Sequence, residues 1–214
     1  MKHPDSKTAP RIVPLSPNGQ VRYWADLLDK EAAAKAFAAL QTGLDWRQLP
    51  VRMFGRSIPQ PRLTAYYGDP GSDYRYSGLS LAPQAWPRTL AALRDLVAAA
   101  TGARLNCVLC NLYRDGRDYM GWHADNEAEL GPEPLIASLS LGATRRFVFK
   151  PRAGDGERRS FELTSGSLLE MSGEVQRHWL HQLPRALRVL QPRINLTFRY
   201  IDSPPGSNGC SESG

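Results

Sequence analysis

The sequence predicts a mainly β fold of the α+β type: a closed antiparallel sandwich with helices packed outside it. Three observations predict this fold. Short apolar runs separated by turn residues dominate from Leu105 onward, which is typical of antiparallel sandwiches and barrels. Two longer stretches with helical spacing precede them. The chain's 214 residues suit one domain with a sizeable core.

The helical stretches lie in the first half of the chain. Residues 23–43 are alanine-rich and predict one or two helices, for which Asp26 and Asp29 are candidate caps. Residues 86–102 predict a further helix, with a proline near its start and Gly102 as its stop. The regularly spaced leucines of both stretches are expected to face the core.

The second half of the chain is expected to consist mostly of strands. They are predicted at residues 105–113, 135–141, 147–150, 161–163, 167–171, 179–183 and 194–200. We expect one domain over residues 20–202. A polar, proline-dotted lead-in at 1–19 is expected to be flexible, and the Ser/Gly/Pro-rich tail at 203–214 is expected to be disordered.

Composition bounds the partners and the compartment. A net charge of +6 and a sequence pI near 9.4 favour a polyanionic partner. The cysteines are Cys107, Cys110 and Cys210. A strand would turn Cys107 and Cys110 to opposite faces, so structural thiols in a reducing compartment are favoured over a zinc site. We find no apolar run suited to a signal peptide or a membrane span, so a cytoplasmic protein is expected.

A candidate metal site begins at His123-Ala-Asp125. At the end of a strand, residues two apart point to the same side. Two imidazoles and one carboxylate on one face of a metal leave positions open, as in the non-heme Fe(II) oxygenases. The second imidazole is either His178 or His181, because a strand through both would turn only one of them inward. A lone His-x-Asp tripeptide is also a common surface accident.

The run from Arg193 to Arg199 alternates cleanly between polar and apolar residues. Arg193, Asn195 and Arg199 therefore share one strand face with Thr197, opposite an apolar face. One interpretation is an ordinary half-buried strand with a solvated polar face. The other is a pocket in which two guanidinium groups hold a dicarboxylate such as 2-oxoglutarate.

Several ordered motifs resemble one known family. They are Asn111-Leu-Tyr113-Arg-Asp-Gly, Trp122-His123-Ala-Asp125-Asn-Glu, Ile136-Ala-Ser-Leu-Ser-Leu-Gly-Ala-Thr-Arg145, Gly166-Ser-Leu-Leu, Trp179-Leu-His181-Gln-Leu-Pro184 and Pro192-Arg193-Ile-Asn195-Leu-Thr-Phe-Arg199. Together they resemble the AlkB-type nucleic-acid dealkylases, above all the animal homologues that act on DNA. The resemblance covers residues 53–201.

This resemblance implies a double-stranded β-helix, or jelly roll, and a set of site residues. Fe(II) would be held by His123, Asp125 and His181. The co-substrate 2-oxoglutarate would be held by Asn111, Tyr113, Arg193, Asn195 and Arg199. With O2, such enzymes oxidise N-methyl groups on bases such as N1-methyladenine and N3-methylcytosine and release formaldehyde. The implied partner is alkylated DNA, with RNA left open, and a monomer is expected.

The resemblance also implies a nucleotide-recognition segment at residues 50–80. Phe54 would be a wedge that fills the gap left by a flipped base; the alternative is a small core hairpin around Gly55. Arg62 would reach a phosphate or the opposite strand. Tyr74 and Tyr76 would form an aromatic platform beside the base, or else be two surface tyrosines in a polar loop.

Asn126 departs from the family pattern. DNA-acting homologues commonly carry an acidic residue there, where it contacts the damaged base, and asparagine keeps the hydrogen bonding without the charge. Two other functions remain open. One is an oxygenase of the same fold that acts on a protein or a small molecule, and the other is a non-catalytic metal-binding jelly-roll module.

Overall fold

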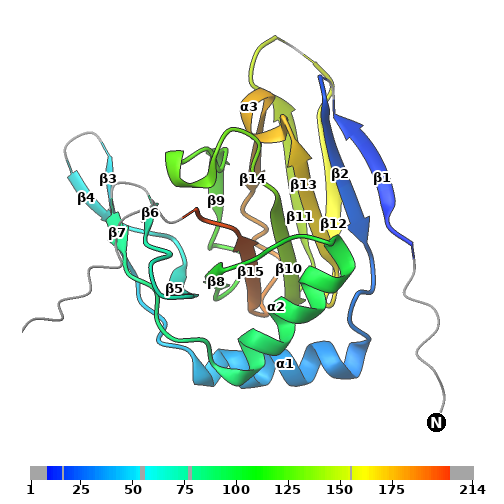
Figure 1. The fold of residues 1–214 in the computed structure, drawn as a ribbon. Coiled ribbons are helices and arrows are strands. Elements are labelled where there is room, and N and C mark those ends of the chain that lie inside the picture. The colour runs from blue at the N-terminus through cyan, green and yellow to red at the C-terminus, as the bar shows by residue number, and fades with distance from the viewer. Residues whose placement is uncertain (1–8, 16, 54–55, 77–78, 155, 203–214) are drawn as a thin grey trace, which may run out of the picture.

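The computed structural model describes residues 9–15, 17–53, 56–76, 79–154 and 156–202. Two antiparallel sheets stack face to face, and two long helices pack on the outside of the larger sheet (Figure 1). This is the jelly-roll arrangement with flanking helices, and the predicted fold class is confirmed.

The larger sheet has seven strands. In spatial order they are β1 (Arg11–Leu15), β2 (Gly19–Trp24), β13 (Leu168–Gly173), β10 (Ile136–Gly142), β15 (Arg193–Arg199), β8 (Cys107–Tyr113) and β5 (Leu63–Gly68). Every neighbouring pair is antiparallel. Strand β15 lies between β10 and β8, so both of its edges are hydrogen-bonded and its side-chain directions are fixed by the register.

The smaller sheet has four strands, in the order β12 (Arg159–Leu163), β11 (Arg145–Pro151), β14 (Trp179–Leu183) and β9 (Met120–His123). Two short hairpins stand apart from both sheets: β3 (Pro50–Met53) with β4 (Arg56–Pro59), and β6 (Tyr74–Tyr76) with β7 (Leu79–Leu81). Both lie beyond the β5 edge of the larger sheet (Figure 1). The short helical elements are a 3-10 turn, η1 (Ala128–Leu130), and a single helical turn, α3 (Val175–His178).

The long helices are α1 (Lys30–Gly43) and α2 (Arg88–Thr101). Asp29 caps α1 by accepting a hydrogen bond from the Ala32 amide at 2.8 Å. Of the two candidate caps, Asp26 and Asp29, Asp29 is therefore the one that is used. Gly102 ends α2 in the left-handed region at φ +73°, which a residue without a Cβ adopts at little cost. No helix in the described residues is long and apolar enough to cross a membrane.

The core divides into two clusters, one on each face of the larger sheet. Alternate residues of β8, β10 and β15 pack against α1 and α2, among them Val108, Leu139 and Leu196. The opposite faces of these strands look into the space between the two sheets, where Leu109, Ile136 and Phe149 are buried. Cys107 and Cys110 fall in different clusters as buried free thiols, as predicted from their spacing.

Two segments near the N-terminus differ from the prediction. The flexible lead-in expected up to Gly19 was wrong for Arg11–Leu15, which pairs with β2 as the edge strand of the larger sheet. Pro14 argued against a strand in the sequence, but proline is tolerated in the edge strand of a sheet. The helix expected from Tyr23 begins only at Lys30, because Tyr23 and Trp24 belong to β2.

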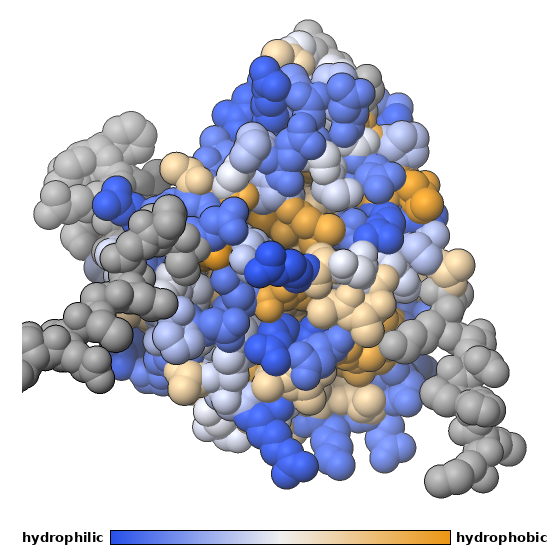
Figure 2. Space-filling view, in the orientation of Figure 1, coloured by the Kyte–Doolittle hydropathy of each residue, from blue (hydrophilic) through white to orange (hydrophobic). Residues whose placement is uncertain are grey.

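The predicted strands of the second half are all present, with bounds shifted by a few residues. Strand β5 was not predicted. Five of its six residues are buried, so it lacks the polar and apolar alternation that marks a half-exposed strand. On the face shown in Figure 2, hydrophilic side chains cover most of the surface around hydrophobic residues gathered near its middle.

Candidate metal centre and co-substrate pocket

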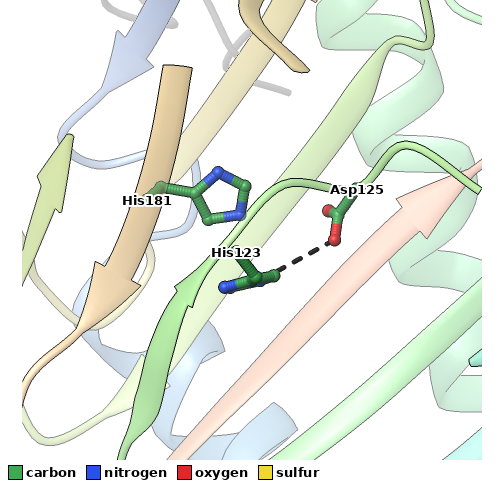
Figure 3. Close-up of side chains that lie close together, drawn as sticks. All are labelled: His123, Asp125 and His181. Carbon is green, nitrogen blue, oxygen red and sulfur yellow. Dashed lines mark ion pairs between the residues drawn. The ribbon is translucent and has the colours of Figure 1, made fainter. Parts of the chain in front are cut away.

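Three side chains from two elements and one loop meet between the sheets. His123 ends β9, Asp125 follows it in the loop, and His181 lies on β14 directly opposite His123 in the strand register. One ligand atom from each lies within 4.8 Å of the others. Figure 3 shows the three side chains side by side, with His123 Nε2 3.8 Å from Asp125 Oδ1. The spacing suits a single divalent cation.

The protonation states of the two imidazoles also suit a metal. His123 Nδ1 lies 2.9 Å from the Gly121 carbonyl oxygen, which can only accept, so Nδ1 carries the proton and Nε2 keeps its lone pair. Burial lowers the pKa of His123. Burial and the neighbouring His123 lower the pKa of His181 to about 3. Both rings are therefore neutral at physiological pH.

Asp125 is held in the ionised form. Burial alone would raise the pKa of its carboxyl, but Arg199, His181 and His123 outweigh that effect and lower it to about 2. Arg199 Nη2 donates to Asp125 Oδ2 at 3.1 Å, and both side chains are buried. The site thus offers two neutral nitrogen donors and one carboxylate, the donor set of a mononuclear Fe(II) site with open positions.

His178 is excluded as the second imidazole. It lies in the last position of α3, where its Nε2 is 3.7 Å from Glu174 Oε2, and it is partly exposed. The sequence left His178 and His181 as alternatives on one strand, but the strand begins at Trp179. His181 is the residue that joins His123 and Asp125.

A pocket beside the triad is lined by the inner faces of β8 and β15. Its walls include all the residues expected to hold 2-oxoglutarate: Asn111, Tyr113, Arg193, Asn195 and Arg199. The polar face of β15 is therefore buried against the metal site, and the solvated-face alternative was wrong. Asn195 is fixed by a hydrogen bond from its Nδ2 to Ser138 Oγ at 2.8 Å.

Arg193 is the pocket's most informative residue. Its side chain is 1% exposed, and its Nη2 donates to Ser140 Oγ at 2.9 Å. Its Nε and Nη1 have no hydrogen-bond partner among the described residues. Burial lowers the pKa of Arg193 to about 10, an effect that Tyr113 partly offsets, so it remains a cation. A buried guanidinium with free donors is costly unless an anion pairs with it, and a carboxylate fits this geometry.

Comparison with known proteins agrees with this donor set. The family model of the 2OG-Fe(II) oxygenase superfamily matches residues 20–199. The chain belongs to that superfamily. The prediction of an oxygenase that depends on Fe(II) and 2-oxoglutarate is thereby confirmed at the level of the family, whose members use Fe(II), 2-oxoglutarate and O2.

Within the 2OG-Fe(II) oxygenases, the chain is similar to AlkB homologues. It is 43% identical to the DNA oxidative demethylase ALKBH2 of Mus musculus over 185 residues, which cover 82% of this chain and 77% of that protein. The corresponding match covers 60% of human ALKBH2. The chain is also 37% identical to the alpha-ketoglutarate-dependent dioxygenase alkB homolog 3 of Bos taurus over 204 residues, which cover 90% of this chain and 71% of that protein. The predicted resemblance to this family is confirmed.

The fold has a solved counterpart. The structure of OsALKBH1 superposes with a TM-score of 0.61 at 16% sequence identity, covering 88% of this chain and 99% of the other. At that identity the likeness concerns the fold alone, and it supports the jelly roll of this oxygenase.

Two residues expected at the substrate are buried instead. Tyr74 is fully buried and stacks on Tyr66, with ring centroids 5.8 Å apart. Arg62 is 4% exposed, and its Nε donates to Asn111 Oδ1 at 2.8 Å. Tyr74 therefore does not present an open face to a base in this structure, and the Arg62 side chain contacts a pocket residue instead of lying exposed on the surface. Tertiary packing, which the sequence does not reveal, buries both side chains.

The other expected substrate residues lie at or beyond the edge of what the structure describes. Phe54 falls outside the described residues, as does the side chain of Tyr76. The hairpin predicted around Gly55 is present as β3 and β4. Asn126 is exposed and lines a separate cleft with Arg152, Gln176 and Arg177, outside the walls of the metal pocket.

Gln176 is a site residue that sequence reasoning missed. This side chain of α3 is 2% exposed, and its Oε1 accepts a hydrogen bond from the Asp125 amide at 2.9 Å. Its Nε2 lies 3.4 Å from Met171 Sδ on β13. Gln176 thus ties the metal-binding loop to the larger sheet. A glutamine 51 residues along the chain from the aspartate gives no motif that would reveal this contact.

The two histidines three residues apart provide a matched test of the metal centre. His181→Ala is expected to abolish Mn(II) binding, because one of only three protein ligands is lost, whereas His178→Ala is expected to bind Mn(II) as the wild type does. Calorimetric titration of the metal-free proteins measures both. Equal losses in the two variants would contradict the assignment.

Gln176→Leu is expected to weaken Mn(II) binding by about 10- to 100-fold, the usual effect of removing a partner that orients a metal ligand. The same titration measures it, and Gln182→Leu, on β14, is the control. Urea unfolding of the metal-free variants separates loss of affinity from loss of stability. Unchanged Mn(II) affinity in Gln176→Leu would refute the orienting role.

Proposed function

We propose that this protein is an oxidative dealkylase that removes N-methyl groups from bases such as N1-methyladenine and N3-methylcytosine in DNA. The observation that carries the proposal is the pairing of the His123, Asp125 and His181 triad with a pocket in which buried Arg193 has free donors. Relatives named as DNA oxidative demethylases, at 43% identity, support the choice of substrate.

The residues present fit the cofactor and the co-substrate. His123, Asp125 and His181 would hold Fe(II). Arg193, with Asn111 and Tyr113, would bind the distal carboxylate of 2-oxoglutarate, and Arg199 with Asn195 would bind the carboxylate next to the keto group. Bound Fe(II), 2-oxoglutarate and O2 supply an oxidation that converts the N-methyl group to formaldehyde and 2-oxoglutarate to succinate and CO2.

The protein's own contribution is placement and electrostatics. The two arginines are held in position by the register of β15 and carry the charge that complements a dicarboxylate. Asp125 stays ionised beside neutral imidazoles, so metal binding requires no proton to leave the site at neutral pH. The apolar residues between the sheets, such as Leu109 and Phe149, keep bulk water from the inner end of the pocket.

A base inside a duplex cannot reach a metal buried between two sheets, so the target nucleotide must be flipped out or already unpaired. We assign recognition to residues 50–80, whose two hairpins lie beyond the β5 edge (Figure 1). Phe54, Tyr76 and Asn126 remain candidate contacts. The chain's net charge of +6 favours the polyanion. Single-stranded RNA presents the same bases and is the second substrate to test.

We further propose that the enzyme works as a monomer in a reducing compartment such as the cytoplasm. Cys107 and Cys110 support the second point, because both are buried as free thiols on opposite faces of the larger sheet. Sedimentation of the purified protein with and without an oligonucleotide tests the first.

The direct test follows the mass of methylated oligonucleotides incubated with the protein, Fe(II), ascorbate and 2-oxoglutarate. We expect loss of one methylene unit from N1-methyladenine or N3-methylcytosine, dependent on 2-oxoglutarate and abolished in His123→Ala. Single-stranded DNA, duplex DNA and RNA are compared in parallel. Consumption of 2-oxoglutarate with every oligonucleotide unchanged would instead favour an oxygenase that acts on a protein or a small molecule.

Arg193→Met is expected to weaken 2-oxoglutarate binding by about 10- to 100-fold, because hydrogen bonds to a charged group contribute about 1.5–3 kcal/mol each. The dependence of turnover on 2-oxoglutarate concentration measures the change. Arg146→Met, at an exposed position of β11, is the control. A co-substrate requirement unchanged in Arg193→Met would show that this arginine does not bind the co-substrate.

A further inference from the structure

A further buried arginine lies next to Tyr113, behind the wall of the pocket. Arg145, the first residue of β11, is 2% exposed. Its guanidinium donates to three backbone carbonyls: Asp115 at 3.3 Å, Asp118 at 2.9 Å and Pro184 at 2.7 Å. Burial lowers the pKa of Arg145, although Tyr113 and the Asp118 and Asp115 carboxylates partly offset that effect. Neutral carbonyls recover only part of the cost of burying a cation, so this arrangement calls for a reason beyond packing.

The three carbonyls belong to two different loops. Asp115 and Asp118 lie in the loop that follows β8, and Pro184 begins the loop that leads into β15. The loops also bond directly, from the Gly116 amide to the Val189 carbonyl at 2.7 Å and from the Ala186 amide to the Gly116 carbonyl at 2.8 Å. A Cβ at Gly116 would overlap the Ala186 carbonyl oxygen, so only glycine allows this approach. Arg145 thus fastens two closely apposed loops.

These loops adjoin the two residues assigned to the distal carboxylate. Tyr113 is the last residue of β8 and Arg193 is the first residue of β15. The two are direct partners in the strand register. Arg145 Cζ lies 5.8 Å and Arg193 Cζ 5.3 Å from the centroid of the Tyr113 ring. Loosening either loop would free the strand end that carries one of these groups.

We propose that Arg145 is a positioning residue for the co-substrate: by tying both loops together, it sets Tyr113 and Arg193 to receive the distal carboxylate of 2-oxoglutarate. This inference rests on the proposed function. Arg145 would act through the two loops, without contacting the co-substrate or the metal. Because those loops adjoin only Tyr113 and Arg193, loss of Arg145 is expected to affect only the end of the pocket that binds the distal carboxylate. The chelating end, built on His123, Asp125 and Arg199, keeps its own contacts.

Two ligands separate the ends of the pocket. Oxalate has two carboxylates that can chelate a metal but lacks a distal carboxylate, whereas 2-oxoglutarate uses both ends. Calorimetric binding of each to the Mn(II)-loaded protein is compared for the wild type and Arg145→Met. We expect 2-oxoglutarate to bind about 10- to 100-fold more weakly in the variant, as for a misplaced binding group, and oxalate to bind as in the wild type.

Arg114→Met is the matched control, because Arg114 bonds to Asp118 within its own loop and does not bridge to the second. Arg145→Lys keeps the charge but offers a single nitrogen to the three carbonyls, so an intermediate loss is expected if Arg145→Met fails to fold. In turnover, the KM for 2-oxoglutarate should rise while kcat at saturation stays near the wild-type value.

Four results would overturn the inference. Equal losses for 2-oxoglutarate and oxalate would reduce Arg145 to a general structural role. Unchanged 2-oxoglutarate binding in both Arg145 variants, or an equal loss in Arg114→Met, would remove the positioning role. Failure of the wild-type protein to bind 2-oxoglutarate while it binds oxalate would instead overturn the proposed function, and this inference with it.

Discussion

The buried ion pair between Arg199 and Asp125 is the constraint on which the site depends. It joins the end of β15 to the metal-binding loop at 3.1 Å, with side-chain exposures of only 3% and 5%. Removing either partner of such a buried pair leaves an unpaired charge in the interior, which strongly destabilises the folded protein. Although burial alone lowers the pKa of Arg199, Asp125, Tyr74 and Glu127 together raise it well above its ordinary range. The same contact therefore keeps the metal carboxylate ionised and fixes its position.

Strand β15 carries this constraint into the core. Its polar face supplies Arg193, Asn195 and Arg199 to the pocket, while Ile194, Leu196 and Phe198 pack under the helices. A slip of one residue in its register would exchange the two faces. Hydrogen bonds to β10 and β8 on both edges prevent that slip. The binding groups are thus as rigid as the hydrophobic core behind them.

The sequence predicted those parts of the fold and site that alternation and short motifs encode. The faces of β15, the cap at Gly102 and the pairing of His123 with Asp125 are examples, whereas only the family resemblance favoured His181 over His178. Strand β5 escaped prediction because burial on both faces removes alternation. Gln176 escaped because its hydrogen bond joins residues far apart in sequence. Periodicity gives the direction of a side chain within its element, and only the assembled sheets decide what covers it.

Tyr74 illustrates the consequence for the substrate side. The family resemblance implied an open platform of Tyr74 and Tyr76, yet the Tyr74 ring stacks on Tyr66 and lies 5.2 Å from the Arg199 guanidinium. A cation over an aromatic face is stabilised, and more so when both are desolvated. Tyr74 therefore stabilises the Arg199 cation, which keeps Asp125 ionised. Truncating Tyr74 would disturb Arg199 and, through it, the metal ligand Asp125. Loss of activity in a Tyr74 variant would therefore not by itself identify a substrate contact.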